Sequence, residues 1–272
     1  MAANHYKALG YTILLCWLAL LQSAAYAALS DENWPMVKER FFNQRPVTPT
    51  HLIQVIAPLG AENAAQVPVT LQVSNQQQDP IKNIYLFVDA NPIPMVAHYQ
   101  FPLSFNTLAL STRIRMENDS HIRAIAETEQ GALLMATTIV NAGGGCAGAV
   151  AVDEAIVREN AGKVKFQLNP PYKLNETASA TLQIKHPMYT GLQIDTKTKQ
   201  LKPAFYMQYA DILFEQTSVM KVEFNVGTAE NPYLNFRFDL PTSHHHTRVD
   251  KVHIELSDNE QKAVVHTIDL NH

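Results

Sequence analysis

Cysteine is almost absent from this chain, which has two thiols, Cys16 and Cys146, among 272 residues. No Cys-x-x-Cys pair occurs, so a common arrangement for a structural zinc ion is missing. The His-Glu-x-x-His and Gly-x-Ser-x-Gly motifs are missing as well. The sequence therefore lacks the patterns of zinc peptidases and of serine hydrolases.

Positive charge and long apolar runs are also scarce. Lysine and arginine number 21 against 25 acidic residues, which gives a net charge of −4 without any basic stripe. This balance argues against a nucleic acid partner. Beyond the N-terminus, no segment is apolar enough to span a membrane.

The N-terminus is the exception. Lys7 precedes a short apolar stretch at residues 13–21, and residues 25–27 (Ala-Tyr-Ala) fit the small-x-small pattern of a cleavage site. We therefore predict a secretory signal peptide over residues 1–27, with an uncleaved N-terminal anchor as the alternative. Its removal takes away Cys16 and leaves 245 residues with a net charge of −5, because Lys7 is its one charged residue.

Glycine is sparse apart from one place. Four of the ten glycines lie within residues 141–149, three directly before Cys146 and one two positions after it. Such a segment is a poor helix and a poor strand, and it is typical of a flexible linker. The composition fits both a cysteine on a flexible arm and a linker with an incidental cysteine. The glycines of the predicted arm are Gly143, Gly144, Gly145 and Gly148.

An exported location favours the first of these interpretations. After cleavage Cys146 is the one remaining thiol, and a lone cysteine in an oxidising compartment suggests intermolecular pairing or a reactive thiol. We expect Cys146 to be exposed, and to form a disulfide homodimer on air oxidation. Its small, uncharged neighbours offer no activating cation, so a partner enzyme would have to supply one.

Alternation of apolar and polar residues predicts an all-β chain. Short strand patterns separated by turn residues recur on both sides of the glycine segment, as is typical of antiparallel sandwiches. A short N-terminal helix is predicted over residues 31–42. Strands are predicted at 67–73, 84–88, 112–116, 122–126, 133–140, 178–186, 220–226, 233–240, 251–256 and 263–268.

Three consecutive histidines form a second candidate site, made of His244, His245 and His246. Neutral imidazoles bind transition metals, but neighbouring residues of an extended chain point to opposite faces and do not converge. A solvated loop is the favoured interpretation, and no metal site is predicted. A cysteine–histidine hydrolase is disfavoured too, because a flexible arm is a poor place for a preorganised nucleophile.

Several short motifs carry a resemblance to known families. In the first half they are residues 58–63 (Pro-Leu-Gly-Ala-Glu-Asn), 67–68 (Val-Pro), 91–94 (Asn-Pro-Ile-Pro), 114–116 (Ile-Arg-Met) and 143–148 (Gly-Gly-Gly-Cys-Ala-Gly). In the second half they are residues 186–191 (His-Pro-Met-Tyr-Thr-Gly) and 230–236 (Glu-Asn-Pro-Tyr-Leu-Asn-Phe). The first half resembles SoxY, the sulfur-carrying subunit of sulfur oxidation, and the second half resembles SoxZ. The chain is similar to a fusion of the two, of the type associated with quinoprotein dehydrogenases.

The resemblance implies a carrier rather than an enzyme, with no cofactor. It implies two immunoglobulin-like sandwiches, at residues 28–140 and 156–272, joined by a carrier linker at residues 141–155. Cys146 would bear a sulfur-containing adduct, thiosulfate-derived or related. It would present this adduct to sulfur-oxidation or quinoprotein dehydrogenase enzymes in the periplasm, free of the membrane once the signal is cleaved.

Two features depart from the family pattern. Ala147 stands where the family has glycine, and Cys146 is followed by a second domain rather than by a free C-terminus. A loop tethered at both ends can bulge outward but cannot enter a deep channel as a single strand. The alternatives are an accessory protein for a quinoprotein dehydrogenase, with Cys146 dispensable, and a metal-handling sandwich that uses the three histidines.

Overall fold

The structure is a computed structural model that describes residues 33–74, 78–103, 105, 107–142, 154–169, 177–239 and 250–270. Contacts between residues divide the chain into two units, Met1–Gln44 and Arg45–His272. The signal peptide predicted over residues 1–27 lies outside the described residues. No helix within the described ranges is long and apolar enough to cross a membrane.

The first unit contains helix α2, which runs from Trp34 to Phe42. A proline, Pro35, lies in its first turn, where the missing backbone N–H needs no partner. The helix ends at Asn43, whose φ of 52° places it outside the helical region. The predicted short N-terminal helix is therefore confirmed.

The second unit consists of fifteen described strands and one further helix, α3, at Glu154–Asn160. The strands of the first half are β1 Val47–Pro49, β2 Ile53–Ile56, β3 Val67–Ser74, β4 Ile81–Val88, β5 Met95–Gln100, β6 Thr107–Ile114, β7 Ser120–Thr128 and β8 Leu133–Val140. Those of the second half are β9 Val164–Asn169, β10 Thr177–Ile184, β11 Met207–Phe214, β12 Thr217–Phe224, β13 Tyr233–Asp239, β14 Lys251–Asp258 and β15 Ala263–Asp269.

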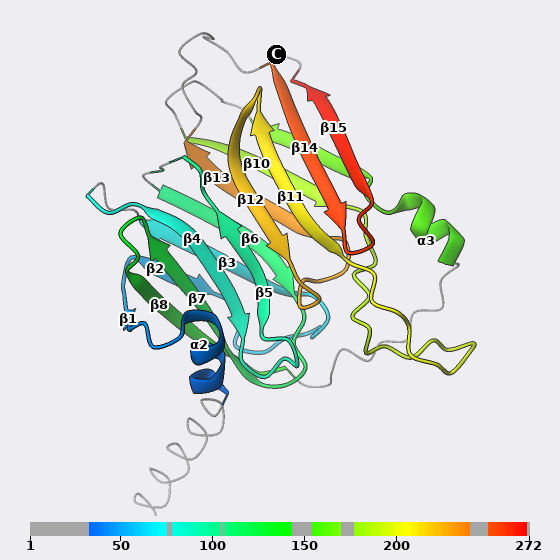
Figure 1. Ribbon diagram of the computed structural model, residues 1–272, viewed down its shortest axis with the longest axis horizontal. Coiled ribbons are helices and arrows are strands. Elements are labelled where there is room, and N and C mark those ends of the chain that lie inside the picture. Colours follow the sequence, from blue (N-terminus) through cyan, green and yellow to red (C-terminus); the bar gives the residue numbers. More distant parts are fainter. Residues whose placement is uncertain are drawn as a thin grey trace, which may run out of the picture. The chain divides into compact units, whose positions relative to one another are not determined.

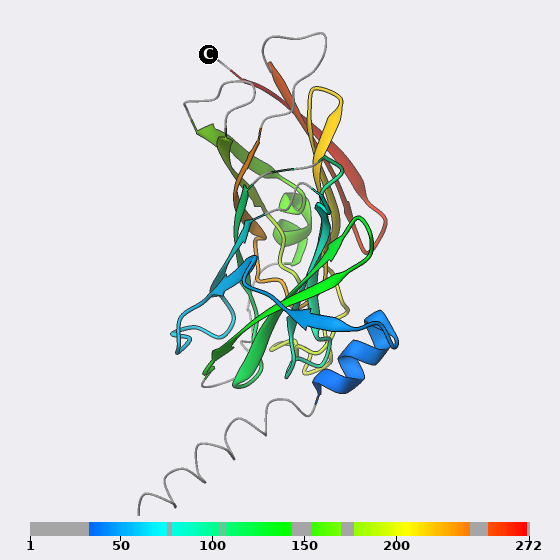
Figure 2. The same cartoon turned by 90° about the vertical axis from the view of Figure 1, so that its left-hand side faces the viewer.

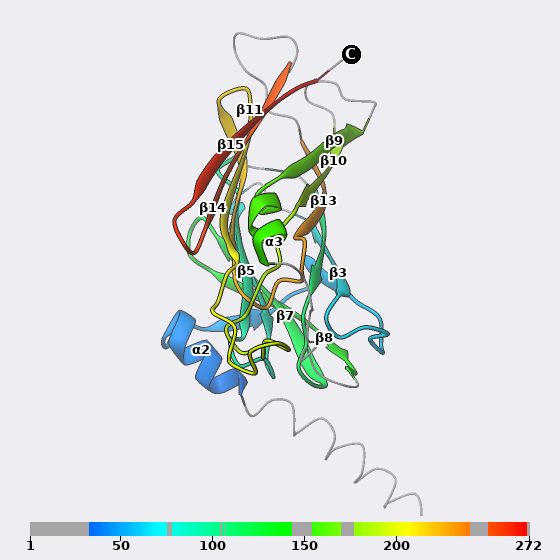
Figure 3. The same cartoon turned by 90° about the vertical axis from the view of Figure 1, so that its right-hand side faces the viewer.

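These strands form two sheets, which confirms the all-β prediction. Nine strands lie in the order β1-β8-β7-β4-β5-β12-β11-β14-β15, and six lie in the order β2-β3-β6-β13-β10-β9. Neighbouring strands are antiparallel, except that β1 pairs with β8 in parallel. Figure 1 shows the nine-stranded sheet, and Figures 2 and 3 show the two sheets of this unit as separate layers.

Both sheets run through both halves of the chain (Figure 1). In the larger sheet β12 of the second half pairs with β5 of the first, with Val222 opposite Tyr99. In the smaller sheet β13 pairs with β6, with Phe236 opposite Leu110. Each half is thus a sandwich whose edge strands pair with those of the other half, an arrangement that the sequence did not predict.

The space between the two sheets holds one hydrophobic core. Alternation along β3 buries one side of the strand, including Leu71, and exposes or half-exposes the other, as a strand between core and solvent requires. The core cluster contains Tyr99 and Leu110 from the first half together with Phe214 and Phe236 from the second. Separating the halves would therefore expose apolar area that folding buries.

One buried arginine also joins the two halves. Arg115, just after β6, donates through its guanidinium to the carbonyl of Met188 and, at 3.3 Å, to that of Pro187. A third carbonyl, that of Val226, lies 3.4 Å away, and the Arg115 backbone N–H donates to Gly227 at 2.7 Å. A buried guanidinium is tolerated only when its donors are satisfied, and here backbone carbonyls of the second half satisfy them.

Replacing Arg115 with alanine should therefore weaken the whole fold. We expect Arg115→Ala to lower the free energy of unfolding by about 3 kcal/mol or more, because buried carbonyls lose a charged donor. Urea denaturation followed by tryptophan fluorescence and by circular dichroism measures the change. The matched control is Arg113→Ala, which removes an exposed arginine lying over the Tyr233 ring at 4.9 Å and should change stability by about 1 kcal/mol or less. Equal effects of the two substitutions would contradict the role given to Arg115.

Candidate functional site

The residues predicted to carry chemistry lie outside the described ranges. These are Cys146 with the arm glycines Gly143, Gly144, Gly145 and Gly148, and also His244, His245 and His246. The structure does describe where the chain enters and leaves the segment 143–153. It places these two anchor points on different halves of the protein.

The first anchor is the end of β8. Asn141 forms an isolated parallel bridge with Gly60, and its carbonyl accepts from the N–H of Ala61 at 2.8 Å. The next N–H, that of Ala142, donates to the carboxylate of Asp119 at 2.8 Å. Ala142 is buried, so the chain is held by the first half up to that residue.

The second anchor is helix α3, which begins at Glu154. The Glu154 carboxylate pairs with Lys202 at 3.0 Å and with Arg158, one helical turn later, at 3.0 Å. Arg158 also pairs with Glu260 in the β14–β15 turn at 2.8 Å, and its guanidinium lies 4.3 Å above the Phe205 ring. Figure 3 shows α3 between the strands of the two sheets in the second half. The sequence analysis did not predict this helix.

The two anchors limit how far the thiol can travel. Cys146 is four residues after Ala142 and eight residues before Glu154. An extended chain spans at most about 3.3–3.6 Å per residue, so Cys146 can lie about 13–14 Å from Ala142 and about 26–29 Å from Glu154. The shorter side therefore sets the tighter upper limit on the distance between the thiol and the described chain.

A half-open pocket of about 250 Å³ adjoins α3. Its lining includes Ile156 and Val157 of α3 together with His186 and Tyr189. His186 is buried and its ring packs 4.4 Å from that of Phe205. Apolar side chains of α3 and the imidazole of His186 thus line the same pocket next to the second anchor.

The protonation state of His186 follows from its surroundings. The Met188 N–H donates to Nδ1 at 3.3 Å, so the neutral ring carries its proton on Nε2. That nitrogen has no hydrogen-bond partner among the described residues. Burial, and then the positive charges of Arg158 and Lys262, lower the pKa of His186 to about 4 because both disfavour the imidazolium.

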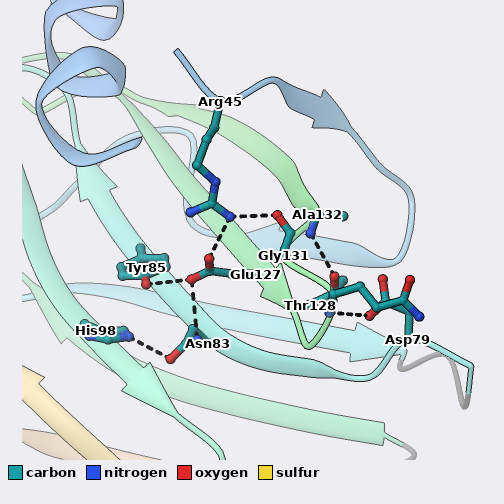
Figure 4. A network of polar contacts seen from close by, with 10 residues as sticks. Arg45, Asp79, Asn83, Tyr85, His98, Glu127, Thr128, Gly131 and Ala132 are labelled. Carbon is teal, nitrogen blue, oxygen red and sulfur yellow. Dashed lines mark hydrogen bonds and ion pairs between the residues drawn. The ribbon is translucent and has the colours of Figure 1, made fainter. Parts of the chain in front are cut away.

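A second cluster of polar side chains lies on the outer face of the nine-stranded sheet (Figure 4). Arg45 donates to the Glu127 carboxylate at 2.7 Å, and the Tyr85 hydroxyl donates to the same carboxylate at 2.9 Å. The Tyr85 ring stacks on His98 at 4.2 Å. His98 contacts the amide oxygen of Asn83 at 3.0 Å.

This cluster stabilises the sheet rather than offering a reactive group. Burial, reinforced by the bond to Glu127, raises the pKa of Tyr85 well above its ordinary value, so the phenol stays a donor. Burial lowers the pKa of His98, against the opposing charge of Glu223. The Glu127 carboxylate already accepts from Arg45, from Tyr85 and, at 3.5 Å, from the amide of Asn83. Among the described residues no group of three His, Cys, Asp or Glu side chains could hold a metal ion.

Comparison with known proteins finds two families along the chain. The family model for the sulfur oxidation protein SoxY matches residues 38–146, and that for the sulfur oxidation protein SoxZ matches residues 166–269. The sulfur carrier protein SoxY from Chlorobium limicola f. thiosulfatophilum is 30% identical, with 42% of this chain and 99% of that chain covered and a TM-score of 0.36. A superoxide reductase (neelaredoxin) from Ignicoccus hospitalis is 16% identical, over 35% of this chain and 82% of that one, with a TM-score of 0.29. No curated protein matches the chain.

The chain therefore belongs to the SoxY and SoxZ families, with a SoxY domain followed by a SoxZ domain in one polypeptide. These families support a carrier in sulfur oxidation, which interacts with the enzymes of that process, rather than a catalyst. The SoxY match ends at Cys146, and the SoxZ match begins after α3.

The pH dependence of stability should reveal the buried imidazole. The pKa of His186 is about 4 in the folded protein, below the ordinary histidine value of 6.5 that applies to the unfolded chain. Between pH 4 and pH 6.5 the unfolded chain therefore binds a proton that the folded protein does not. The free energy of unfolding should therefore be unaffected by His186 above pH 6.5. It should fall as the pH is lowered towards 4, by up to about 3 kcal/mol from this residue. Urea titrations at several pH values measure the slope.

The control for this prediction is His186→Gln, which cannot titrate. Its stability at pH 8 reports only the change in packing, because His186 is neutral there in both states. Between pH 6.5 and pH 4, the free energy of unfolding of this variant should change less with pH than that of the unmodified protein. Identical slopes would show that His186 is not the titrating group.

Proposed function

We propose that this protein is an exported, periplasmic carrier that bears a sulfur-containing adduct, thiosulfate-derived or related, on Cys146. The carrier presents that adduct to enzymes of sulfur oxidation and does not itself catalyse a reaction. The signal peptide over residues 1–27 directs the export, and the glycines on both sides of Cys146 let the thiol turn within its tether.

The observation that carries this proposal is the placement of one thiol between two fixed anchors in a SoxY–SoxZ chain. After signal cleavage Cys146 has no second cysteine to pair with in the same chain. Hydrogen bonds to Leu59, Ala61 and Asp119 hold one side, and ion pairs at Glu154 hold the other. Fixed ends with a glycine-rich segment between them suit a group that must be offered to other proteins.

Intact-mass analysis tests the adduct directly. Protein purified without reductant from cells that oxidise thiosulfate should show a mass increase that corresponds to added sulfur. Dithiothreitol should remove this mass, because a sulfur–sulfur bond exchanges with thiols. Cys146→Ser protein from the same cells should show the unmodified mass. Full function with Cys146→Ser and no adduct on the unmodified protein would favour an accessory role for a quinoprotein dehydrogenase instead.

Shortening the tether distinguishes an arm from an incidental linker. Deleting Gly143 and Gly144 removes about 7 Å of reach on the limiting side, so enzymatic loading of Cys146 should fall at least tenfold. Alkylation by iodoacetamide should stay unchanged, because a small reagent needs no reach. The matched control deletes Ala149 and Val150 from the longer side, which leaves the tighter limit from Ala142 unchanged, and loading should stay within about twofold. An equal loss of Cys146 loading from both deletions would contradict the interpretation of the glycine segment as an arm.

A further inference from the structure

The connection between β10 and β11 is a hairpin that presents apolar side chains to solvent. We call residues 189–205 the exposed hairpin; it closes through two antiparallel bridges, Tyr189 with Phe205 and Ile194 with Leu201. Three large aliphatic side chains on it are mostly exposed: Leu192 at 57%, Ile194 at 59% and Leu201 at 64%. Large aliphatic side chains gathered at the surface of a folded protein mark an interaction site more often than a lone one does.

The backbone of the exposed hairpin fixes these side chains on one face. The Lys202 N–H donates to the Gln193 carbonyl at 2.8 Å, which makes Ile194 and Leu201 a non-hydrogen-bonded pair. Side chains of such a pair lie close together on the same face. At the tip, the Asp195 carboxylate accepts from the N–H of Lys197 at 2.8 Å. The hairpin is therefore a structured surface feature.

The charge of the exposed hairpin is opposite to that of the whole chain. Residues 190–204 contain three lysines and one acid, Asp195, whereas the chain as a whole has a net charge of −4. Lys197 and Lys199 are exposed at the tip. Backbone hydrogen bonds already occupy the Asp195 carboxylate and lower its pKa. A partner suited to this surface has an apolar patch bordered by carboxylates.

The exposed hairpin is tied to the anchor that ends the carrier segment. Lys202 pairs with Glu154 at 3.0 Å, and its ammonium group lies 3.9 Å from the centre of the Tyr189 ring. Glu154 is eight residues after Cys146, so the thiol lies within about 26–29 Å of it. That length is close to the diameter of a small domain, so one partner can contact both features.

We propose that the exposed hairpin is the docking surface for the sulfur-oxidation enzyme that acts on Cys146. The apolar pair Ile194 and Leu201 provides the centre of the contact, with Leu192 beside it. Lys197 and Lys199 steer an acidic rim of the enzyme. The inference rests on the proposed carrier function for the identity of the partner, but the contact itself requires no thiol.

Calorimetric titration of a purified sulfur-oxidation enzyme from the same organism tests the contact. All proteins carry Cys146→Ser, so that binding is measured without turnover. Added substitutions Leu192→Ser, Ile194→Ser and Leu201→Ser should raise the Kd at least tenfold with an unchanged Tm, because the three side chains are exposed. Lys197→Glu with Lys199→Glu should also raise the Kd, and more strongly at low salt.

The matched control is Lys163→Glu with Lys165→Glu, the same change of charge on two exposed lysines with the same spacing elsewhere in the SoxZ half. Its Kd should stay within about twofold. Equal weakening by both charge pairs, no effect of the serine substitutions, or no binding of the starting protein would overturn the proposal. So would sedimentation data in which the serine substitutions dissolve a dimer, since the hairpin would then contact a second copy. A second form of the triple serine variant retains Cys146. Normal loading of Cys146 in that form would refute docking and leave the carrier function intact, whereas hairpin-dependent binding without any adduct would do the reverse.

Discussion

The pairing of edge strands across the two halves is the interaction on which the rest of the structure depends. The pairs β5–β12 and β6–β13 convert two sandwiches into one pair of continuous sheets, and Arg115 fastens the same junction through carbonyls of the second half. The carrier segment leaves the first half at Ala142 and joins the second half at Glu154. The distance that this segment must bridge therefore depends on the pairing of strands at the junction. If the two halves moved relative to each other, the range of positions open to the Cys146 thiol would widen, although no residue near the thiol had changed.

The segments on the two sides of Cys146 differ in length, so the two anchors limit the position of the thiol to different degrees. The four residues from Ala142 restrict the volume in which the thiol can be found, and a restricted volume raises its effective concentration for a bound partner. The eight residues to Glu154 set a looser limit of about 26–29 Å. Glu154 is held by Lys202 of the exposed hairpin, so one ion pair joins the proposed docking surface to the end of the segment that bears Cys146.

Sequence reasoning found many of the elements whose pattern is local, although it missed β9, which also alternates, and β11. β3, β13 and β14 alternate over their whole length, so their inner faces are visible without a structure. β5 was not predicted because four of its six residues are buried, which removes the alternation. β1 and β2 were not predicted because they are too short to show a period. Helix α3 is a seven-residue segment after apolar residues, with too few turns to reveal an amphipathic face.

The candidate site divides in the same way. Cys146 stands out by composition, as a lone thiol among glycines, whereas the burial of His186 depends on Phe205 and on α3, which come from distant parts of the chain. The junction between the halves could not be predicted, because hydrogen bonds between edge strands depend on backbone position and leave little trace in side-chain pattern.

Joining the two halves in one chain also affects how the protein reaches its folded state. A first half that folds alone presents β5 and β6 as open edges, one on each sheet, with unpaired backbone groups ready to bind other chains. The second half covers both edges at once with β12 and β13. Because the second half follows the first half in the chain, it is synthesised later, and for an interval the first half is complete but uncovered. The covalent link keeps the matching edges of the same molecule close during that interval, so that they compete effectively against aggregation with neighbouring chains.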